Sequence, residues 1–105
     1  MLSGRLAFLS VVVLAAVSAP ARAATIRITI DKLAFSPAAA SAKVGDTVEW
    51  VNKDALAHTA TARDGALDVT LPPSKTVSSV LKKAGTVDYY CRFHPNMKAT
   101  LTIAP

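Results

Sequence analysis

GTVDYYCRFHPNM, residues 85–97, contains a cysteine, a histidine and a methionine at intervals of three residues: Cys91, His94 and Met97. A thiolate, an imidazole and a thioether form a soft ligand set, which suits copper better than calcium, magnesium or manganese. A trigonal copper site also needs a second imidazole, and the chain's other histidine is His58. The pattern therefore predicts a metal site built from His58, Cys91, His94 and Met97.

Each of these residues also has an ordinary structural interpretation. A free cysteine is often a small buried hydrophobic residue, a single methionine often fills a core, and a single histidine often lies on the surface. Those interpretations leave the regular C-x-x-H-x-x-M spacing of residues 91–97 unexplained. The spacing therefore favours a metal site. A structural module in which Cys91 is free or cross-linked between chains stays an alternative.

The segments on either side of this loop, and most of the sequence before it, are typical of β-strands. Apolar and polar residues alternate in them, and turn signals such as Val44-Gly45-Asp46 and Asp64-Gly65 separate them. Short strands at this spacing predict a small antiparallel β-sandwich with Greek-key connections. The predicted strands are residues 25–30, 47–51, 57–63, 76–81, 86–91 and 99–103, and residues 33–37 continue the first of them more irregularly, up to a proline that limits pairing.

Two segments fit the strand pattern poorly. Residues 37–44 contain four alanines and are the one stretch that suggests a helical turn. Residues 71–74, Leu-Pro-Pro-Ser, predict a loop, because proline has no N–H to donate to a sheet. The sequence contains no internal repeat and no sign of a second domain. We therefore expect residues 24–105 to form one all-β domain.

The N-terminal residues 1–23 have the order of features found in a secretory signal peptide. A short, positively charged start precedes an apolar run over residues 6–17, and Ala21-Arg22-Ala23 supplies an A-x-A cleavage site. The run is shorter than the roughly 20 apolar residues that a membrane span needs. We expect cleavage after Ala23 and export of residues 24–105 to the periplasm without a membrane span. An uncleaved N-terminal anchor is the alternative.

Charge and cysteine content narrow the class of protein further. After cleavage the domain would carry ten lysines and arginines against seven acidic residues, a net charge of +3. The longest basic run is the pair Lys82-Lys83, so nucleic-acid binding is not expected. A single cysteine cannot form an internal disulfide, although a domain this small is marginally stable without some cross-link. A metal held by Cys91 would supply that cross-link.

Residues 44–103 resemble the cupredoxin family of small blue-copper β-sandwiches. The resemblance implies one copper ion, with His58, Cys91 and His94 in its equatorial plane and Met97 as a weak axial ligand. Such a ligand shell has no open position for a substrate, so the resemblance implies an electron carrier and not an enzyme. The matching segments are VGDTVEWVN (44–52), AHT (57–59), AGTVDYYC (84–91) and HPNM (94–97).

The short ligand loop is similar to that of the amicyanin group, which takes electrons from methylamine dehydrogenase and passes them to a c-type cytochrome. Amicyanin-like loops have Thr-Pro where this chain has Arg92-Phe93, asparagine where it has Thr59, and glycine where it has Ala99. None of these departures removes a ligand. The resemblance implies a periplasmic carrier between a dehydrogenase and a cytochrome. A periplasmic copper-binding or copper-delivery protein with the same ligands is the alternative.

The residues around the second histidine are candidates for contact with a redox partner. By the family's pattern, His94 lies nearest to solvent and gives the electron its exit. Leu56, Phe93 and Pro95 are predicted to form an apolar patch around it, where a partner docks briefly, and Arg92 is predicted to steer an acidic partner. Ordinary loop packing is the alternative for these side chains. A carrier of this size is expected to be a monomer.

Overall fold

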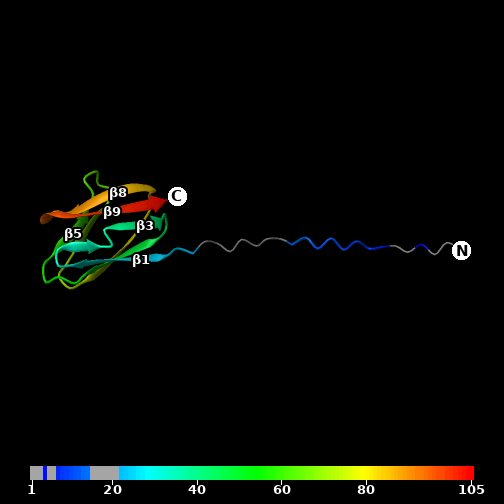
Figure 1. Ribbon diagram of the computed structural model, residues 1–105, viewed down its shortest axis with the longest axis horizontal. Coiled ribbons are helices and arrows are strands. Elements are labelled where there is room, and N and C mark those ends of the chain that lie inside the picture. Colours follow the sequence, from blue (N-terminus) through cyan, green and yellow to red (C-terminus); the bar gives the residue numbers. More distant parts are fainter. Residues whose placement is uncertain (1–3, 5–6, 15–21) are drawn as a thin grey trace.

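The computed structural model describes residues 4, 7–14 and 22–105, and the last of these segments contains nine β-strands (Figure 1). The predicted all-β fold is confirmed. Among the described residues no helix is long and apolar enough to span a membrane. The strands are β1 (Thr25–Asp31), β2 (Ala34–Ser36), β3 (Ala39–Lys43), β4 (Thr47–Asn52), β5 (His58–Thr61), β6 (Asp68–Leu71), β7 (Thr76–Val80), β8 (Gly85–Cys91) and β9 (His94–Ala104).

The strands form two sheets that pack face to face as a sandwich. One sheet has the order β2-β1-β4-β7 and the other has the order β3-β9-β8-β5-β6. Both sheets are mixed, whereas the sequence predicted antiparallel sheets, because β1 pairs with β4 and β3 pairs with β9 in parallel. The chain leaves the first sheet after β2, forms β3 in the second sheet, and returns as β4 beside β1. β4 therefore runs in the direction of β1.

The core lies between the sheets and follows the alternation of the strands. In β1 the side chains of Ile28 and Ile30 are fully buried. Trp50, which pairs with Ile28 in the neighbouring β4, is fully buried as well. Tyr89 of β8 packs edge-on against Phe35 and Trp50, with ring centroids 4.9 and 5.4 Å apart. Burial raises the pKa of the Tyr89 phenol above its ordinary value. These large side chains link the two sheets and fix their separation.

Two local predictions require correction. Residues 39–43, within the stretch that suggested a helical turn, form β3, because Ala40 and Ala42 point toward the core while their neighbours are exposed. Leu71, placed in a loop by the sequence, ends β6, which pairs antiparallel with β5 and buries Leu71 completely. The prolines that indicated a loop begin only at residue 72.

The predicted signal peptide lies largely outside the described residues, which omit 1–3, 5–6 and 15–21. Residues 7–14 are exposed and belong to no strand, although most of them are apolar. In the part of the chain that the structure describes, all strands and all buried core residues lie within residues 24–105.

Candidate metal centre

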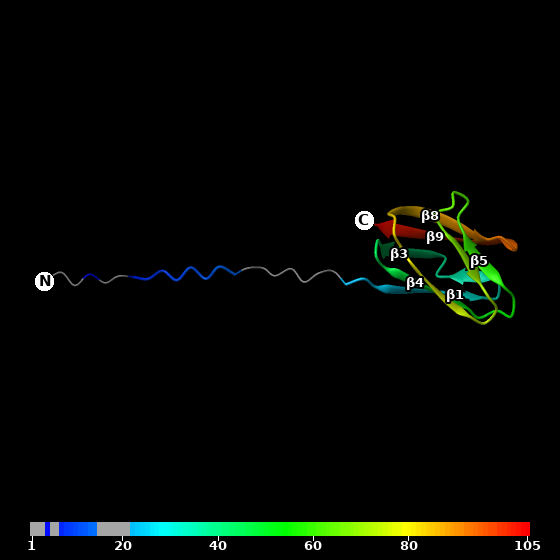
Figure 2. The same cartoon turned by 180° about the vertical axis from the view of Figure 1, so that it is seen from behind.

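Three strands bring the predicted ligands to one end of the sandwich. His58 is the first residue of β5, Cys91 is the last of β8, and His94 is the first of β9. Cys91 pairs directly with His94 across the β8–β9 turn, with a register shift at Tyr90/Cys91. The C-terminus and the start of β1 lie at the opposite end of the domain (Figures 1 and 2).

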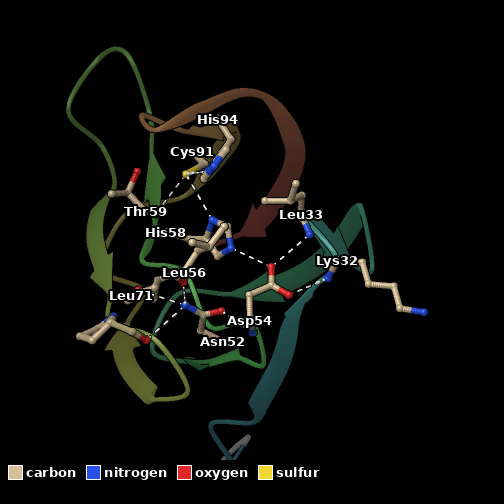
Figure 3. A network of polar contacts seen from close by, with 11 residues as sticks. Lys32, Leu33, Asn52, Asp54, Leu56, His58, Thr59, Leu71, Cys91 and His94 are labelled. Carbon is tan, nitrogen blue, oxygen red and sulfur yellow. Dashed lines mark hydrogen bonds and ion pairs between the residues drawn. The ribbon is translucent and has the colours of Figure 1, made fainter.

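The cysteine sulfur and one nitrogen of each imidazole ring form a compact triangle. Cys91 Sγ is 3.7 Å from His58 Nδ1 and 3.8 Å from His94 Nδ1, and the three ligand atoms all lie within 4.8 Å of one another (Figure 3). Cys91 and His58 have no solvent-exposed surface, whereas His94 is partly exposed. One thiolate and two imidazoles, converging at this spacing, fit a single copper ion.

Met97, the fourth predicted ligand, is nearly fully buried in β9, three residues after His94. Between them, Pro95 and Asn96 are exposed. The side chain of Met97 therefore lies in the interior of the sandwich, near the end of β9 that carries His94. A weakly bound thioether is the usual fourth ligand of a His₂Cys copper site.

Thr59 connects the first ligand strand to the cysteine and to the turn after it. Its backbone N–H donates to Cys91 Sγ at 3.4 Å, and its side-chain Oγ1 accepts a hydrogen bond from the backbone N–H of Arg92 at 2.9 Å. Thr61 Oγ1 lies 3.0 Å from Thr59 Oγ1 and 3.0 Å from Asp68 Oδ1. Thr59 therefore supplies a hydrogen-bond donor to the cysteine sulfur and an acceptor to the turn that follows it.

Asn52 holds the loop before His58 instead of contacting the sulfur. Its side-chain amide donates to the carbonyl oxygens of Leu56, Leu71 and Pro72 at 2.9, 3.1 and 3.2 Å (Figure 3). Its Oδ1 accepts a hydrogen bond from the backbone N–H of Asp54 at 3.0 Å. One buried amide thereby fixes both ends of the loop that leads into β5.

Asp54 is the residue at the site that the sequence did not identify. Its Oδ2 lies 2.7 Å from His58 Nε2. The same carboxylate accepts hydrogen bonds from the backbone N–H groups of Lys32 and Leu33, at 2.8 and 3.0 Å. With an acceptor beside Nε2, that nitrogen carries the proton, and the Nδ1 lone pair faces the Cys91 sulfur.

The charge state of Asp54 follows from the same contacts. Partial burial is the largest single influence and raises the pKa of Asp54. The hydrogen bonds from Leu33, His58 and Lys32 together outweigh that influence, so the pKa lies below its usual value. The carboxylate is therefore ionised at neutral pH, the state in which both of its oxygens act only as acceptors. A signal in the sequence was an acid four residues before a candidate histidine ligand.

Thr59→Val is expected to lower the free energy of unfolding of the metal-free domain by about 1 kcal/mol, the usual net value of one hydrogen bond. Valine keeps the volume of threonine but removes the acceptor that Arg92 N–H uses. Urea unfolding would measure the change, with Thr59→Ser as the matched control because it keeps the hydroxyl. Equal stability of the two variants would show that the hydroxyl does not support the turn.

Comparisons with known proteins agree with this geometry. Residues 4–103 match the family of cupredoxin-like domains. The chain is 34% identical to the methylamine utilization protein MauL of Methylorubrum extorquens, over 81% of this chain and 78% of that protein. It is 33% identical to amicyanin-alpha of the same organism, over 79% of this chain and 75% of the relative.

A solved structure supports the same assignment. A reduced Cu(I) form of an amicyanin variant, determined at pH 4, superposes with a TM-score of 0.67 at 30% identity, covering 75% of this chain and 81% of that one. The family match covers nearly the whole sequence, including both histidines and the cysteine that converge at the end of the sandwich. The chain therefore belongs to the cupredoxin family of blue-copper electron carriers.

Proposed function

We propose that this chain carries single electrons on one copper ion, held by His58, Cys91 and His94 with Met97 as a weak fourth ligand. The observation that carries the proposal is the convergence of one buried sulfur with two imidazole Nδ1 atoms, which lie 3.7 and 3.8 Å from it. Copper bound there would supply a one-electron redox couple between Cu(I) and Cu(II). The four side chains would fill its shell and leave no position for a substrate.

The residues around the ligands would keep the site rigid during electron transfer. The Asp54 carboxylate contacts Nε2 of His58, the ring nitrogen that does not face the sulfur. The Thr59 N–H donates a hydrogen bond to the Cys91 sulfur. Hydrogen bonds to a coordinating sulfur are one of the means by which a protein tunes the reduction potential. Because each ligand is fixed by the sandwich, little movement would accompany a change of oxidation state.

The predicted contact patch includes Phe93 and Pro95, the two neighbours in the chain of the partly exposed His94. Leu56 and Phe93 are 53% and 57% exposed, unusually high for large apolar side chains, and Pro95 is exposed as well. We propose that these side chains form the docking surface for redox partners. Arg92 lies beside them with its guanidinium 3.6 Å from the Asp68 carboxylate. Part of its charge is therefore offset, which weakens its proposed steering of an acidic partner.

Phe93→Ala is expected to slow electron transfer to a c-type cytochrome about tenfold while leaving copper binding and colour unchanged. Loss of one exposed aromatic contact typically costs about 1–2 kcal/mol of docking free energy, and about 1.4 kcal/mol corresponds to a factor of ten. Stopped-flow measurement of the second-order rate would test this. Val80→Ala is the matched control, because Val80 is equally exposed but lies on β7 opposite Thr47, at the other end of the sandwich. Equal rates for both variants would remove Phe93 from the docking surface.

The partners and location proposed for this carrier follow from its relatives and its N-terminus. Because the relatives include a methylamine utilization protein and amicyanin-alpha, we propose an amine dehydrogenase as donor and a c-type cytochrome as acceptor. We also propose that residues 1–23 direct export to the periplasm and are then removed. The exposed apolar side chains of residues 8–14 support removal, since a folded soluble domain rarely retains such a segment.

The proposed function is tested by titrating the metal-free domain, residues 24–105, with Cu(II). An intense blue absorption that saturates at one copper per chain, bleaches with a reductant and returns with an oxidant is expected. That result would establish thiolate-to-copper charge transfer and reversible electron carriage. A weakly coloured complex would favour the alternative of copper binding or delivery. Rapid oxidation of Cys91 without a stable complex would leave a structural module.

A further inference from the structure

The first residue of the expected mature chain, Ala24, is anchored at the end of the sandwich opposite the metal centre. Its backbone N–H donates to Asp46 Oδ1 at 2.8 Å, and its carbonyl oxygen accepts a hydrogen bond from Thr47 N–H at 2.9 Å. The second oxygen of the Asp46 carboxylate accepts the backbone N–H of Lys43 at 2.9 Å. Asp46 is only 6% exposed. A buried carboxylate therefore holds the residue at which the expected cleavage leaves a new terminus.

The turn that carries Asp46 is also held by backbone hydrogen bonds that do not involve the N-terminal residues. The backbone around Asp46 is tied to the β7–β8 connection, because Leu81 N–H donates to the Asp46 carbonyl and Gly45 N–H donates to the Leu81 carbonyl, each at 2.8 Å. Val44 N–H donates to the carbonyl of Ala104 at 2.9 Å, so the same turn is tied to the end of β9. Gly45 adopts a φ of 95°, which favours glycine and lets the turn close here.

The residues just before Ala24 do not share this anchorage. Residues 22–25 are all exposed, and Ala24 is the first of them whose backbone makes hydrogen bonds to the domain, directly before β1 begins at Thr25. In Figure 2 the chain leading to β1 extends away from the domain. The boundary between exposed chain and anchored strand thus coincides with the A-x-A site that the sequence predicts. In the uncleaved chain, Ala24 offers the carboxylate a neutral amide N–H. After cleavage at that boundary, it would offer an α-amino group.

We propose that removal of residues 1–23 converts the Ala24–Asp46 hydrogen bond into an ion pair that locks the mature N-terminus onto the β3–β4 turn. This inference rests on the proposed cleavage after Ala23. The new α-amino group has three N–H donors and a positive charge. The amide that it replaces has one N–H donor and no charge. Charge-assisted hydrogen bonds are roughly twice as strong as neutral ones, so correct processing itself stabilises the domain.

The charge states of both partners at neutral pH agree with an ion pair. The hydrogen bond from Ala24, followed by that from Lys43, lowers the pKa of Asp46, and the Lys43 ammonium acts in the same direction. An α-amino group ordinarily titrates at about 7.7–8.0, and a neighbouring carboxylate favours its protonated form. Both groups are therefore charged near pH 7.

The same geometry makes the contact specific for a chain that begins at residue 24. One extra residue would move the α-amino group by up to about 3.8 Å, the distance between consecutive Cα atoms, and leave a neutral amide at the carboxylate. A chain that begins at Thr25 would leave Asp46 Oδ1 without its donor. Only one terminus therefore completes the site.

Three forms of the domain with wild-type side chains test the inference at pH 7: residues 24–105 with a free α-amino group, the same chain N-acetylated, and residues 23–105. Thermal unfolding is expected at a midpoint about 5 °C higher for the free form than for the other two. Asp46→Asn should abolish the difference between free and acetylated forms. Equal midpoints for the three wild-type forms would overturn the proposal, and so would a difference that persists in Asp46→Asn.

Two further measurements keep the result interpretable. If Asp46→Asn does not fold, NMR titration of the free form replaces it: a raised pKa of the Ala24 α-amino group supports the ion pair, and an ordinary value contradicts it. The mass of the exported protein must place its first residue at Ala24, and any other start overturns the maturation step. Copper binding should be equal in all three forms, so failure of this inference is distinguishable from failure of the proposed electron transfer.

Discussion

Replacing Cys91 with serine is expected to abolish the intense blue absorption of the copper-loaded protein completely. The colour of a blue-copper site arises from charge transfer between a cysteine thiolate and Cu(II), and Cys91 is the chain's single cysteine. A serine hydroxyl is a harder and far less acidic group, so it cannot replace the thiolate as a ligand for Cu(I). The two histidines would remain, so we expect the variant to bind Cu(II) only weakly and without intense colour.

The Cys91→Ser variant separates metal chemistry from folding. Cys91 lies fully buried in the core cluster with Met97 and Leu101, so a serine there adds a polar group to an apolar environment. Circular dichroism and urea unfolding of both metal-free proteins provide the control, because a folded variant without colour localises the effect to copper. A variant that keeps the blue band would show that the Cys91 sulfur is not the copper ligand.

Much of this fold could be predicted because β1 and β4 alternate. Their more buried side chains recur at every second position and are apolar except for Asn52 at the end of β4, so the period of two in the sequence is the period of burial in the structure. The ligands could be predicted for a related reason. A turn of two residues between β8 and β9 brings Cys91 and His94 opposite each other, so spacing along the chain becomes proximity in space.

The remainder depends on contacts between distant parts of the chain. β3 has alanines where a strand usually has larger side chains, and it becomes a strand because β9 offers it a partner. The parallel pairing of β1 with β4 follows from the path of the chain between the sheets, which local alternation does not encode. Asp54 also accepts hydrogen bonds from residues 21 and 22 positions earlier, and nothing in the sequence around Asp54 indicates those contacts.

The network around Asp54 explains how a small domain without a disulfide holds its ligands in place. Lys32 and Leu33 have positive φ angles of 50° and 61°, a conformation that costs free energy in residues other than glycine. Their backbone N–H groups both point to the Asp54 carboxylate. The β1–β2 turn and the ligand His58 therefore share one anion, which joins the two sheets at the metal end.

Asp54→Asn is expected to weaken copper binding about 10- to 100-fold, the usual cost of removing the hydrogen-bond partner of a ligating histidine. The two carboxylate oxygens now accept from Lys32, Leu33 and His58. An asparagine has one acceptor oxygen, so its amide NH₂ would face either the Lys32 N–H, or both the Leu33 N–H and the Nε2–H of His58. In the second case the ring loses the partner that fixes its tautomer. In the first, the strained turn loses its support.

Competition with a copper chelator would measure the affinity, and NMR of the metal-free protein would report the protonated nitrogen of His58. Asp64→Asn is the matched control, because Asp64 carries the same charge and accepts one backbone hydrogen bond, from Ala66, in an exposed turn. Equal affinity of the two variants would show that the contact with Asp54 does not position His58. Weaker binding in Asp54→Asn alone, with a mixture of His58 tautomers, would show that the carboxylate orients the ring before copper arrives. The metal centre would then be organised by the fold and not by the ion.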